Sequence, residues 1–550
     1  MKVFLLSSVL GALLFSMLLV PDSAQSQTSR EAGIGEIKRL AGVRQADRFP
    51  GSDVGEQINN AVADCINSGI VCSIYENDSG TISTAPDLPP GFSIHFNPAG
   101  IFTLKTHWNI YHRGTQYFFN GAEFDYAIDD GGVAFYIGKN TTSVVSVRST
   151  RVTWKGGSSF AHIDVGDQIM VDSGSFGPKV CNVAAVNSPT SLTLTSTSCT
   201  TNTDEAATFY MEPGSALGSY PGKAPVLHDL NINSFNSSKR NNVALAIELT
   251  SGVTVNSFAA NNFATGTCLK LLGAITGTYF DIHCNGAKNG LLLDQNSIGR
   301  FWISTSNANR FYGVDLDASP STAGYAFQIN GGSGNLIDGL HAEGNAAHKV
   351  ATIQQITAMG YGSTKIQAGG NRLVILDWER NGDSVRGATD ISIRDASSSN
   401  IIEGGSFTST GGTFIGVSAE SNTRNTILRD TSFVGYQQSY CFAYGATGSV
   451  SNLQSVGTNV APSRSQGDSA GLIFGSKLVY SALLVTSVKP SDTIEILGVI
   501  PNSHCSLTAT NKSAAANLAT TFISQKARNQ ITVTHTAIPG MTFDVLCSAN

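Results

Sequence analysis

Charged side chains are scarce in this chain. Only 13% of its 550 residues are Asp, Glu, Lys or Arg, and the formal net charge is −6. A chain with this charge balance has no basic patch for a phosphate backbone, so we expect no nucleic-acid partner. The low charge does not indicate disorder, because 41% of the residues are hydrophobic. The composition is typical of an all-β extracellular protein with many turns.

Sequence motifs of several protein classes are also missing. No Gly-rich phosphate loop follows a strand and no serine nucleophile elbow is present, which excludes nucleotide-binding and serine-hydrolase classes. Cysteines and histidines do not cluster at the spacing of a zinc site, so we predict no metal and no cofactor. Beyond the first 20 residues, no apolar run is long enough to span a bilayer.

The first 26 residues have the pattern of a secretory signal peptide. Lys2 precedes an apolar run from Val3 to Val20, and small residues follow that run. We expect cleavage after Ser26, with Ala24 as the second choice. A retained membrane anchor is the alternative, because the run is at the lower limit of spanning length. The sequence therefore predicts a secreted protein, located outside the cell, in the periplasm or on the cell surface.

Nine cysteines are present, and an exported chain permits disulfides. Eight of them form four pairs by proximity in the sequence: Cys65 with Cys72, Cys181 with Cys199, Cys268 with Cys284, and Cys505 with Cys547. Cys441 is left over.

The rest of the chain divides into segments that differ in pattern. In order they are a flexible lead-in (27–48), an N-terminal cap with the first coils (49–140), a small inserted β-barrel module (141–212), a parallel β-helix (213–466) and a C-terminal β-sandwich (467–550). Within the cap, Ile58, Val62, Cys65 and Ile66 fall on one face of a helix that ends at Gly69.

From about residue 225 the sequence repeats. The predicted coils begin near Val226, Gly252, Gly277, Gly299, Asn335, Asn371, Asn400, Asn425 and Ser451. The recurring Asn predicts an asparagine ladder, in which side-chain amides bond from coil to coil. Ile337, Leu373, Ile402 and Ile427 are expected to form one inward column. An antiparallel sandwich is the alternative, although its turn signals would recur at shorter spacing.

The cap carries a resemblance to a known superfamily. The stretch from Phe49 to Gly55, the short helix and the Thr81–Thr84 strand are similar to the N-terminal cap of pectate-lyase-like proteins. The resemblance implies an all-β fold built on a right-handed parallel β-helix, and often an activity on acidic or neutral polysaccharides. The Gly-His-Gly and Arg-x-Lys motifs of polygalacturonases are missing, and the one Asn-Thr-Asp, at Asn202–Asp204, lies in the inserted module. No catalytic residue therefore carries over, and the fold alone establishes no activity.

Candidate catalytic residues come from stacking the Asn-anchored coils. Neighbouring coils lie about 4.8 Å apart, so outward side chains form columns. This alignment places His341 over Asp377, and Glu343 over Glu379. Stacked carboxylates repel, which raises one pKa and favours one protonated and one ionised partner. Glycoside hydrolysis requires that division, so we predict these four residues as catalytic.

Three further residues complete the predicted site. Arg372 and Arg380 are expected to hold substrate carboxylates or hydroxyls. Trp378 is included as a substrate-binding residue, although strand alternation turns it inward. The alternative is that Glu343 and Glu379 have a structural role at the turn that follows each strand.

Two other groups of ionisable residues are candidates for a site. Asp281 and His283, with Arg300 expected on the next coil, offer a lyase site, but the neighbouring Cys284 favours a structural strand. Asp129 and Asp130 are predicted to lie in a solvated turn.

Two functions follow from these patterns. The first is a secreted polysaccharide-active enzyme, either a glycoside hydrolase or a polysaccharide lyase. The alternative is a non-catalytic protein of the tailspike or adhesin type that binds glycans at a surface. The expected partner is a polysaccharide or a cell-surface glycan, and an oligomer is possible. The sequence does not choose between these functions.

Overall fold

The computed structural model describes most of the chain from residue 42 onward. The described residues are 42–138, 141–172, 178–201, 203–210, 224–234, 240–298, 302–317, 320–321, 323–346, 349–357, 364–379, 381, 388–409, 415–420, 422–436, 438–442, 446–451, 454–456, 470–474, 477–496, 499, 501–528 and 530–548. The predicted signal peptide and residues 27–41 of the lead-in lie outside them.

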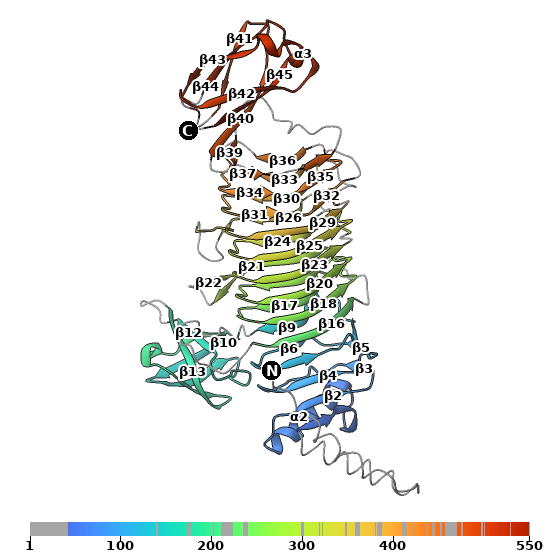
Figure 1. The fold of residues 1–550 in the computed structure, drawn as a ribbon. Coiled ribbons are helices and arrows are strands. Elements are labelled where there is room, and N and C mark those ends of the chain that lie inside the picture. Colours follow the sequence, from blue (N-terminus) through green and yellow to red (C-terminus); the bar gives the residue numbers. More distant parts are fainter. Residues whose placement is uncertain are drawn as a thin grey trace, which may run out of the picture.

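Two long parallel sheets form the body of the molecule, and coil after coil stacks along one axis (Figure 1). The parallel strands of the first sheet are β1 (Val43–Gln45), β2 (Ser73–Glu76), β3 (Gly80–Ile82), β4 (Ser93–Phe96), β5 (Ile101–Leu104), β7 (Gln116–Phe118), β8 (Glu123–Tyr126), β16 (Val226–Ser234), β18 (Thr254–Asn261), β20 (Thr278–Asn285), β23 (Arg310–Asp317), β25 (Leu336–Glu343), β29 (Arg372–Glu379), β31 (Ile401–Glu403), β32 (Ser406–Thr408), β34 (Thr426–Arg429), β35 (Ser432–Val434), β37 (Thr447–Ser451) and β38 (Gln454–Val456). This architecture confirms the predicted parallel β-helix.

The second sheet faces the first, and apolar side chains from both fill the space between them. Its parallel strands are β6 (Trp108–Ile110), β9 (Val133–Gly138), β17 (Val243–Glu248), β19 (Thr267–Leu272), β21 (Asn289–Ile298), β24 (Tyr325–Asn330), β26 (Lys349–Gln354), β30 (Thr389–Arg394), β33 (Ile415–Ala419) and β36 (Gln438–Phe442). Two short hairpins project from the coils, one formed by β21 with β22 (Trp302–Thr305) and one by β27 (Ile356–Thr357) with β28 (Lys365–Ile366).

A helix covers the open end of the first coil. Asp53 caps helix α2 (Val54–Asn67) by accepting a 3.0 Å hydrogen bond from the backbone N–H of Glu56. The buried face of α2 includes Ile58, Val62 and Cys65, as predicted. Ile66 was assigned to that face wrongly, because it is 55% exposed at the edge of the face.

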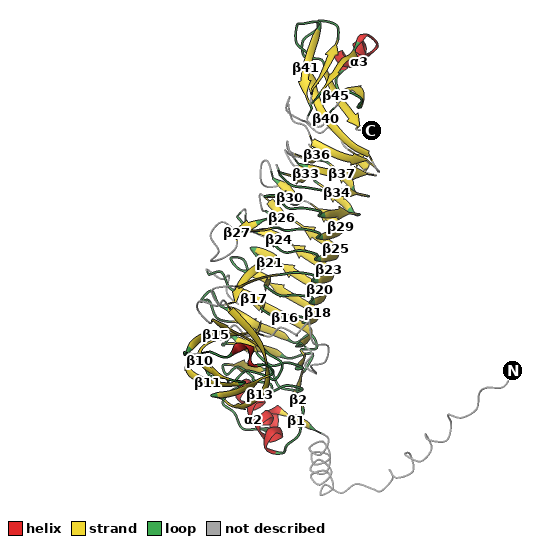
Figure 2. Ribbon diagram, turned by 90° about the vertical axis from the view of Figure 1, so that its left-hand side faces the viewer, coloured by secondary structure: helices red, strands yellow, loops and turns green. Residues whose placement is uncertain are grey.

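The inserted module is a closed six-stranded barrel with its own core. Its strands are β10 (Thr141–Arg148), β11 (Arg151–Gly157), β12 (Gln168–Asp172), β13 (Pro178–Ser188), β14 (Ser191–Leu194) and β15 (Glu205–Tyr210). The barrel lies between β9 and β16 in the chain. It sits beside the lower coils (Figure 1) and in front of them in the view of Figure 2. The stack is not interrupted, because β16 pairs directly with β7 and β8.

Buried ion pairs join the barrel to the coils. Arg113 of the β6–β7 loop pairs with Asp167 of the barrel at 2.8 Å, and the Asp167 side chain is fully buried. A cavity of about 960 Å³ opens beside this contact, between Gly91 and Thr115 of the coils and Val165 of the barrel. The charged groups at its edge are engaged in the junction, so the cavity offers no free catalytic pair.

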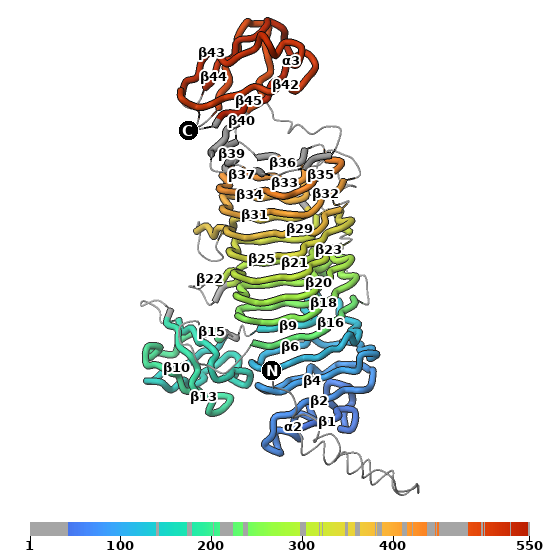
Figure 3. The backbone as a smooth tube through the Cα atoms, in the orientation of Figure 1, coloured from blue at the N-terminus to red at the C-terminus, as the bar shows by residue number. Residues whose placement is uncertain are grey.

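Two antiparallel sheets form the C-terminal unit at the far end of the rod (Figure 3). The strands β39 (Ala470–Phe474), β40 (Lys477–Val485), β42 (His504–Ala509) and β45 (Thr542–Ser548) continue the first sheet of the β-helix, because β39 pairs in parallel with β37. The strands β41 (Ser491–Glu495), β43 (Phe522–Ala527) and β44 (Gln530–Thr534) form a separate sheet. Apolar residues of both sheets share one core, which confirms the predicted sandwich. A short helix, α3 (Lys512–Asn517), follows β42.

Four disulfides are formed, and all four match the pairs predicted from spacing. Cys65–Cys72 joins the cap helix to the first coils, and Cys268–Cys284 joins the two sheets of the β-helix. None of the described helices has the length and apolar character needed to cross a membrane.

A buried asparagine ladder holds the coils in register. The side-chain amide of Asn309 donates to Asn335 at 3.1 Å, Asn335 donates to Asn371 at 2.9 Å, and Asn371 donates to Asn400 at 3.0 Å. The same carboxamide oxygens accept backbone N–H groups of the preceding coil. Thr426 occupies the next position, so Asn425 is not part of the ladder.

The inward column next to the ladder differs from the prediction by one residue. Ile337, Leu373 and Ile402 are buried and in register, as expected. Leu428, rather than Ile427, follows Ile402, because Ile401 pairs with Ile427. The predicted antiparallel alternative for the central body is wrong, because these strands pair in parallel.

Asn371→Ala tests the ladder. The substitution removes two donated and two accepted hydrogen bonds and leaves the buried backbone N–H of Asn335 without its acceptor. We expect a loss of about 2–4 kcal/mol in the free energy of unfolding of the β-helix, measured from urea unfolding midpoints. The matched control is Asn285→Ala on the exposed side of β20, with an expected change below about 0.5 kcal/mol. Equal effects of the two substitutions would contradict the ladder's role.

Candidate functional site

The strands of the first sheet bend at the same position in successive coils. Ser257, Asp281, Gly313 and Gly339 adopt positive φ angles of 61°, 54°, 71° and 73°, and the strand pairing skips each of them. The bend divides the outer face of each strand into two segments. Residues before the bend form one set of outward columns, and residues after it form another.

The ionisable side chains lie after the bend, in two outward columns. We define the acidic patch as His283, Asp315, Asp317, His341, Glu343, Asp377 and Glu379. In the first column the strand register places His283 next to Asp315, Asp315 next to His341, and His341 next to Asp377. In the second column the strand register places Asp317 next to Glu343, and Glu343 next to Glu379. The predicted register of His341 with Asp377, and of Glu343 with Glu379, is therefore confirmed; their catalytic role stays a prediction.

Asp315 is the centre of the patch. One of its carboxylate oxygens lies 2.6 Å from Nδ1 of His341, and the other lies 3.2 Å from Nδ1 of His283. Nε2 of His283 in turn lies 2.9 Å from the carboxylate of Asp281. The two sites predicted separately, one around His341 and one around His283, are thus two ends of a single hydrogen-bonded row.

Asp315 and Asp317 have opposite pKa shifts. Burial disfavours the charge of Asp315, but hydrogen bonds from His341 and His283 outweigh burial and hold its pKa below the usual range. Burial, and then the charge of Asp315, raises the pKa of Asp317 to about 6. In weakly acidic solution Asp317 is therefore protonated while Asp315 is ionised.

The two histidines respond to the same carboxylates. Burial opposes their charged forms, but hydrogen bonds raise the pKa of both, from Asp281 and Asp315 for His283 and from Asp315 for His341. Protonated imidazoles on both sides of Asp315 keep it anionic. Asp317 also has a fixed position, because one of its oxygens accepts the backbone N–H of Glu343 at 3.1 Å.

Aromatic rings lie before the bend, beside one end of the patch. Phe280 and Tyr312 stack with ring centroids 5.3 Å apart, on the same strands as His283 and Asp315. Phe280 is 41% exposed, so its edge is open to solvent. The coils that carry Glu343 and Glu379 have Asp338 and Val374 at the equivalent positions. The apolar surface thus adjoins Asp315 and Asp317 rather than the predicted glutamate pair.

Two of the predicted substrate-binding residues lie away from the patch. Trp378 is fully buried, and its ring stacks on Phe407 in the core at 5.8 Å, so its assignment was wrong. Strand alternation, already apparent in the sequence, is the reason. Arg372 begins β29, about 16 Å of strand away from Asp377, and is paired with Glu403. Arg380 and Arg300 lie outside the described residues.

The corner after the patch is structural. Asn345 and Asn381 are buried, and the amide of Asn345 donates to Asn381 at 2.7 Å. The Asn of the Glu-x-Asn corner is therefore part of a second asparagine ladder. The structural alternative for Glu343 and Glu379 themselves stays a prediction. Asp130, at the predicted N-terminal turn, accepts the backbone N–H of Gly132 and pairs with His107 at 3.0 Å.

The sequence predictions missed Asp315 and Asp317. The hairpin of β21 and β22 inserts residues before β23, so the coil expected near Gly299 instead enters the sheet at Arg310. A signal was present in the sequence: Asn309-Arg310-Phe311-Tyr312-Gly313-Val314 repeats the pattern of Asn335-Leu336-Ile337-Asp338-Gly339-Leu340. Aligning these two segments places Asp315 one coil before His341, and Asp317 one coil before Glu343.

A divalent cation could also bind in the patch. Asp315, Asp317 and His341 each offer one ligand atom, and these atoms lie within 4.8 Å of one another. Two carboxylates and one imidazole form a suitable donor set. The same three residues therefore support either acid–base chemistry or cation binding, and a chelator separates the two.

Comparisons with known proteins are weak. No protein-family model matches the chain, and no curated protein matches it. Among solved structures, it is similar to a surface adhesin of Streptococcus pneumoniae (TM-score 0.34, 9% identity, covering 78% of this chain and 97% of the adhesin). A glycoside hydrolase (TM-score 0.34, 8% identity, 76% and 96% covered) and the Dettilon tailspike protein (TM-score 0.22, 10% identity, 93% and 94% covered) are also similar. Similarities this low say nothing about the function of this chain.

Asp317→Asn tests the electrostatics of the patch. The folded protein keeps a proton on Asp317 up to a pH of about 6, whereas the unfolded chain releases it near pH 4. Wild-type stability therefore falls as the pH rises between these values, and the neutral Asn avoids this loss. We expect the variant to be more stable than wild type by about 1 kcal/mol at pH 7, with little difference near pH 4, in urea unfolding.

Asp315→Asn is the matched comparison. It removes the anion between two imidazoles, so we expect a loss of stability at pH 7. If both substitutions shift the midpoint in the same direction at pH 7, the assigned charge states are wrong.

Proposed function

We propose that this protein is an exported glycoside hydrolase whose active site is the acidic patch. The opposite pKa shifts of Asp315 and Asp317 carry the proposal, because they provide one ionised and one protonated carboxyl group side by side on a solvent-facing sheet. Glycoside hydrolysis requires that pair. The four disulfides support an exported location.

Asp317 acts as the general acid. It donates its proton to the glycosidic oxygen, and the carboxylate of Asp315 attacks the anomeric carbon as that bond breaks. The product is a glycosyl ester on Asp315 and a free leaving alcohol. Asp317, now ionised, takes a proton from a water molecule that attacks the ester, which releases the sugar and restores both carboxyl groups.

The spacing of the carboxyl groups favours a retaining mechanism. Ligand atoms of Asp315 and Asp317 lie within 4.8 Å of each other, which is closer than the roughly 6.5–9.5 Å that inverting enzymes need for a water molecule between their carboxyl groups. His341 and His283 act as positioning residues that hold Asp315 ionised. Glu343 and Glu379 stay candidates for the same two roles, because they are in register on the neighbouring coils.

The charge of the patch favours neutral or basic sugars. Asp315, Asp317, Glu343, Asp377 and Glu379 bring five carboxyl groups together with two imidazoles. A uronate carboxylate would be repelled from such a surface. This argues against a uronate lyase, whose site needs cations to neutralise the substrate. A polysaccharide of neutral or amino sugars is the proposed partner.

Reducing-end release from a panel of neutral and amino-sugar polysaccharides tests the activity. We expect hydrolysis with an optimum below pH 6, because activity declines as Asp317 loses its proton above its pKa of about 6. The expected pH profile is bell-shaped, with the acidic limb set by protonation of Asp315. A rate that rises through pH 6 would contradict the assignment of Asp317 as the acid.

Four substitutions identify the carboxylate pair. Asp317→Asn and Asp315→Asn should each lower kcat about 10²–10⁴-fold with little change in KM, whereas Glu343→Gln and Glu379→Gln should retain most of the activity. The reverse pattern would place the site on the glutamate pair. Activity lost on treatment with a chelator, at a temperature where the protein stays folded, would instead indicate a cation at Asp315, Asp317 and His341.

If the wild-type protein releases no reducing ends, glycan binding decides between the two functions. Binding of a glycan from the panel without release of reducing ends would replace the hydrolase proposal by the non-catalytic surface protein. Proton NMR of the first product formed gives its anomeric configuration, and inversion would remove Asp315 as the nucleophile.

A further inference from the structure

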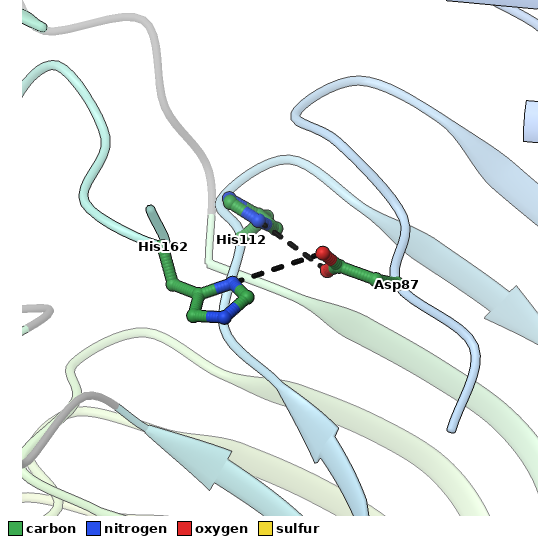
Figure 4. Close-up of side chains that lie close together, drawn as sticks. All are labelled: Asp87, His112 and His162. Atoms are coloured by element: carbon green, nitrogen blue, oxygen red, sulfur yellow. Dashed lines mark ion pairs between the residues drawn. The ribbon is translucent and has the colours of Figure 1, made fainter. Parts of the chain in front are cut away.

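A second cluster of ionisable side chains lies where the barrel meets the β-helix. Asp87 is in the loop between β3 and β4, and His112 is in the loop between β6 and β7. His162 is in the loop between β11 and β12 of the barrel. Figure 4 shows the carboxylate of Asp87 facing both imidazoles, so three loops from two structural units meet at one point.

The distances within this cluster are those of ligands around a metal ion. Nε2 of His112 lies 3.4 Å from one oxygen of Asp87, and Nδ1 of His162 lies 3.7 Å from the other oxygen. The first separation is that of a long, weak hydrogen bond, and the second exceeds the length of a hydrogen bond to nitrogen. Tetrahedral ligands bound at about 2.1 Å lie about 3.4 Å apart. One donor atom from each residue falls within 4.8 Å of the others, as a shared ion requires.

The imidazole of His112 is oriented for metal binding by a buried carboxylate. Its Nδ1 lies 2.8 Å from Asp164, which is 7% exposed and also accepts the backbone N–H of Arg113 at 3.1 Å. With Nδ1 bonded to Asp164, Nε2 is directed at Asp87. A carboxylate behind the metal-binding histidine is the arrangement found in many metal sites, and it raises the basicity of the ligand nitrogen.

The side chains of the other two residues are partly exposed to solvent, while the nitrogen that faces Asp87, Nδ1 of His162, is itself buried. The side chain of His162 is 43% exposed and that of Asp87 is 50% exposed. The ring of His162 stacks on Tyr111 with centroids 4.5 Å apart, which fixes its position. Three protein ligands on a solvent-facing site leave room for water at a fourth position.

A proton competes with any cation at this site. Burial disfavours a charged His112, but hydrogen bonds to Asp164 and Asp87 raise its pKa to about 9. Metal binding must therefore displace that proton, which makes the affinity depend on pH.

We propose that Asp87, His112 and His162 bind one zinc-class transition-metal ion that cross-links the barrel to the β-helix. Two imidazoles and one carboxylate suit Zn²⁺ or a neighbouring first-row ion, whereas Ca²⁺ and Mg²⁺ prefer an all-oxygen set. The site is separate from the acidic patch and does not depend on the proposed hydrolase activity. It replaces the sequence-based expectation of no metal, which rested on tightly spaced ligands; these three are 25 and 50 residues apart.

Calorimetric titration of the whole exported chain with ZnCl₂, after removal of metals by chelation, tests the site. We expect one equivalent of Zn²⁺ to bind to the wild type. His162→Ala and Asp87→Asn should each weaken that binding at least tenfold, and Asp164→Asn should weaken it about 10–100-fold through the orientation of His112. Because His162 is in an exposed loop, its variant is expected to fold. The thermal midpoint should rise with Zn²⁺ in wild type and not in His162→Ala.

His341→Ala is the matched control, since His341 belongs to the other cluster that could hold an ion. It should leave the stoichiometry and affinity for Zn²⁺ unchanged. Three results would overturn the proposal: no saturable binding to wild type, binding lost in His341→Ala but kept in His162→Ala, or equal affinity for Ca²⁺ and Zn²⁺.

Discussion

Coil-to-coil register is the constraint on which this structure depends. Each coil presents its residues directly above those of the coil before, at the strand spacing of about 4.8 Å, so any side chain on the outer face meets its equivalent on the next coil. The buried ladder of Asn309, Asn335, Asn371 and Asn400 maintains that register with hydrogen bonds between buried side-chain amides. The patch of carboxylates and imidazoles is a consequence of this stacking.

Stacking also explains why the patch has unusual charge states. Asp315 and Asp317 are two residues apart on one strand, so their side chains face the same side of the sheet. The repulsion between them cannot be relieved by moving one away. His283 and His341, one coil below and one above, stabilise the charge of Asp315 and leave Asp317 protonated. The surroundings that raise the pKa of Asp317 cost stability at neutral pH, where its carboxyl group is ionised, and such a cost is a common property of catalytic groups.

Much of the fold could be predicted from the sequence, and less of the site. Repeated Asn anchors located the coils from Asn335 to Asn400, and spacing alone paired eight cysteines correctly. Periodicity could not find the strand of Asp315, because the hairpin of β21 and β22 breaks the coil spacing immediately before it. Nor could it find the cluster of Asp87, His112 and His162, since only the docking of the barrel brings those loops together. The local sequence pattern predicts individual strands and coils. A site whose residues are brought together by an inserted hairpin or barrel can be found only in the folded structure.

The central claim is that Asp315 and Asp317 hold opposite charge states in weakly acidic solution. Carbon-13 NMR titration of protein labelled at the aspartate carboxyl groups measures those states directly, and Asp317→Asn assigns the resonance. The account predicts one carboxyl resonance that titrates near pH 6 and is missing from the spectrum of the variant. It also predicts that the Asp315 carboxyl group stays ionised well below that pH. If the resonance lost in the variant titrates near pH 4, as an ordinary aspartate does, the proposed acid is not an acid at the working pH and the account fails.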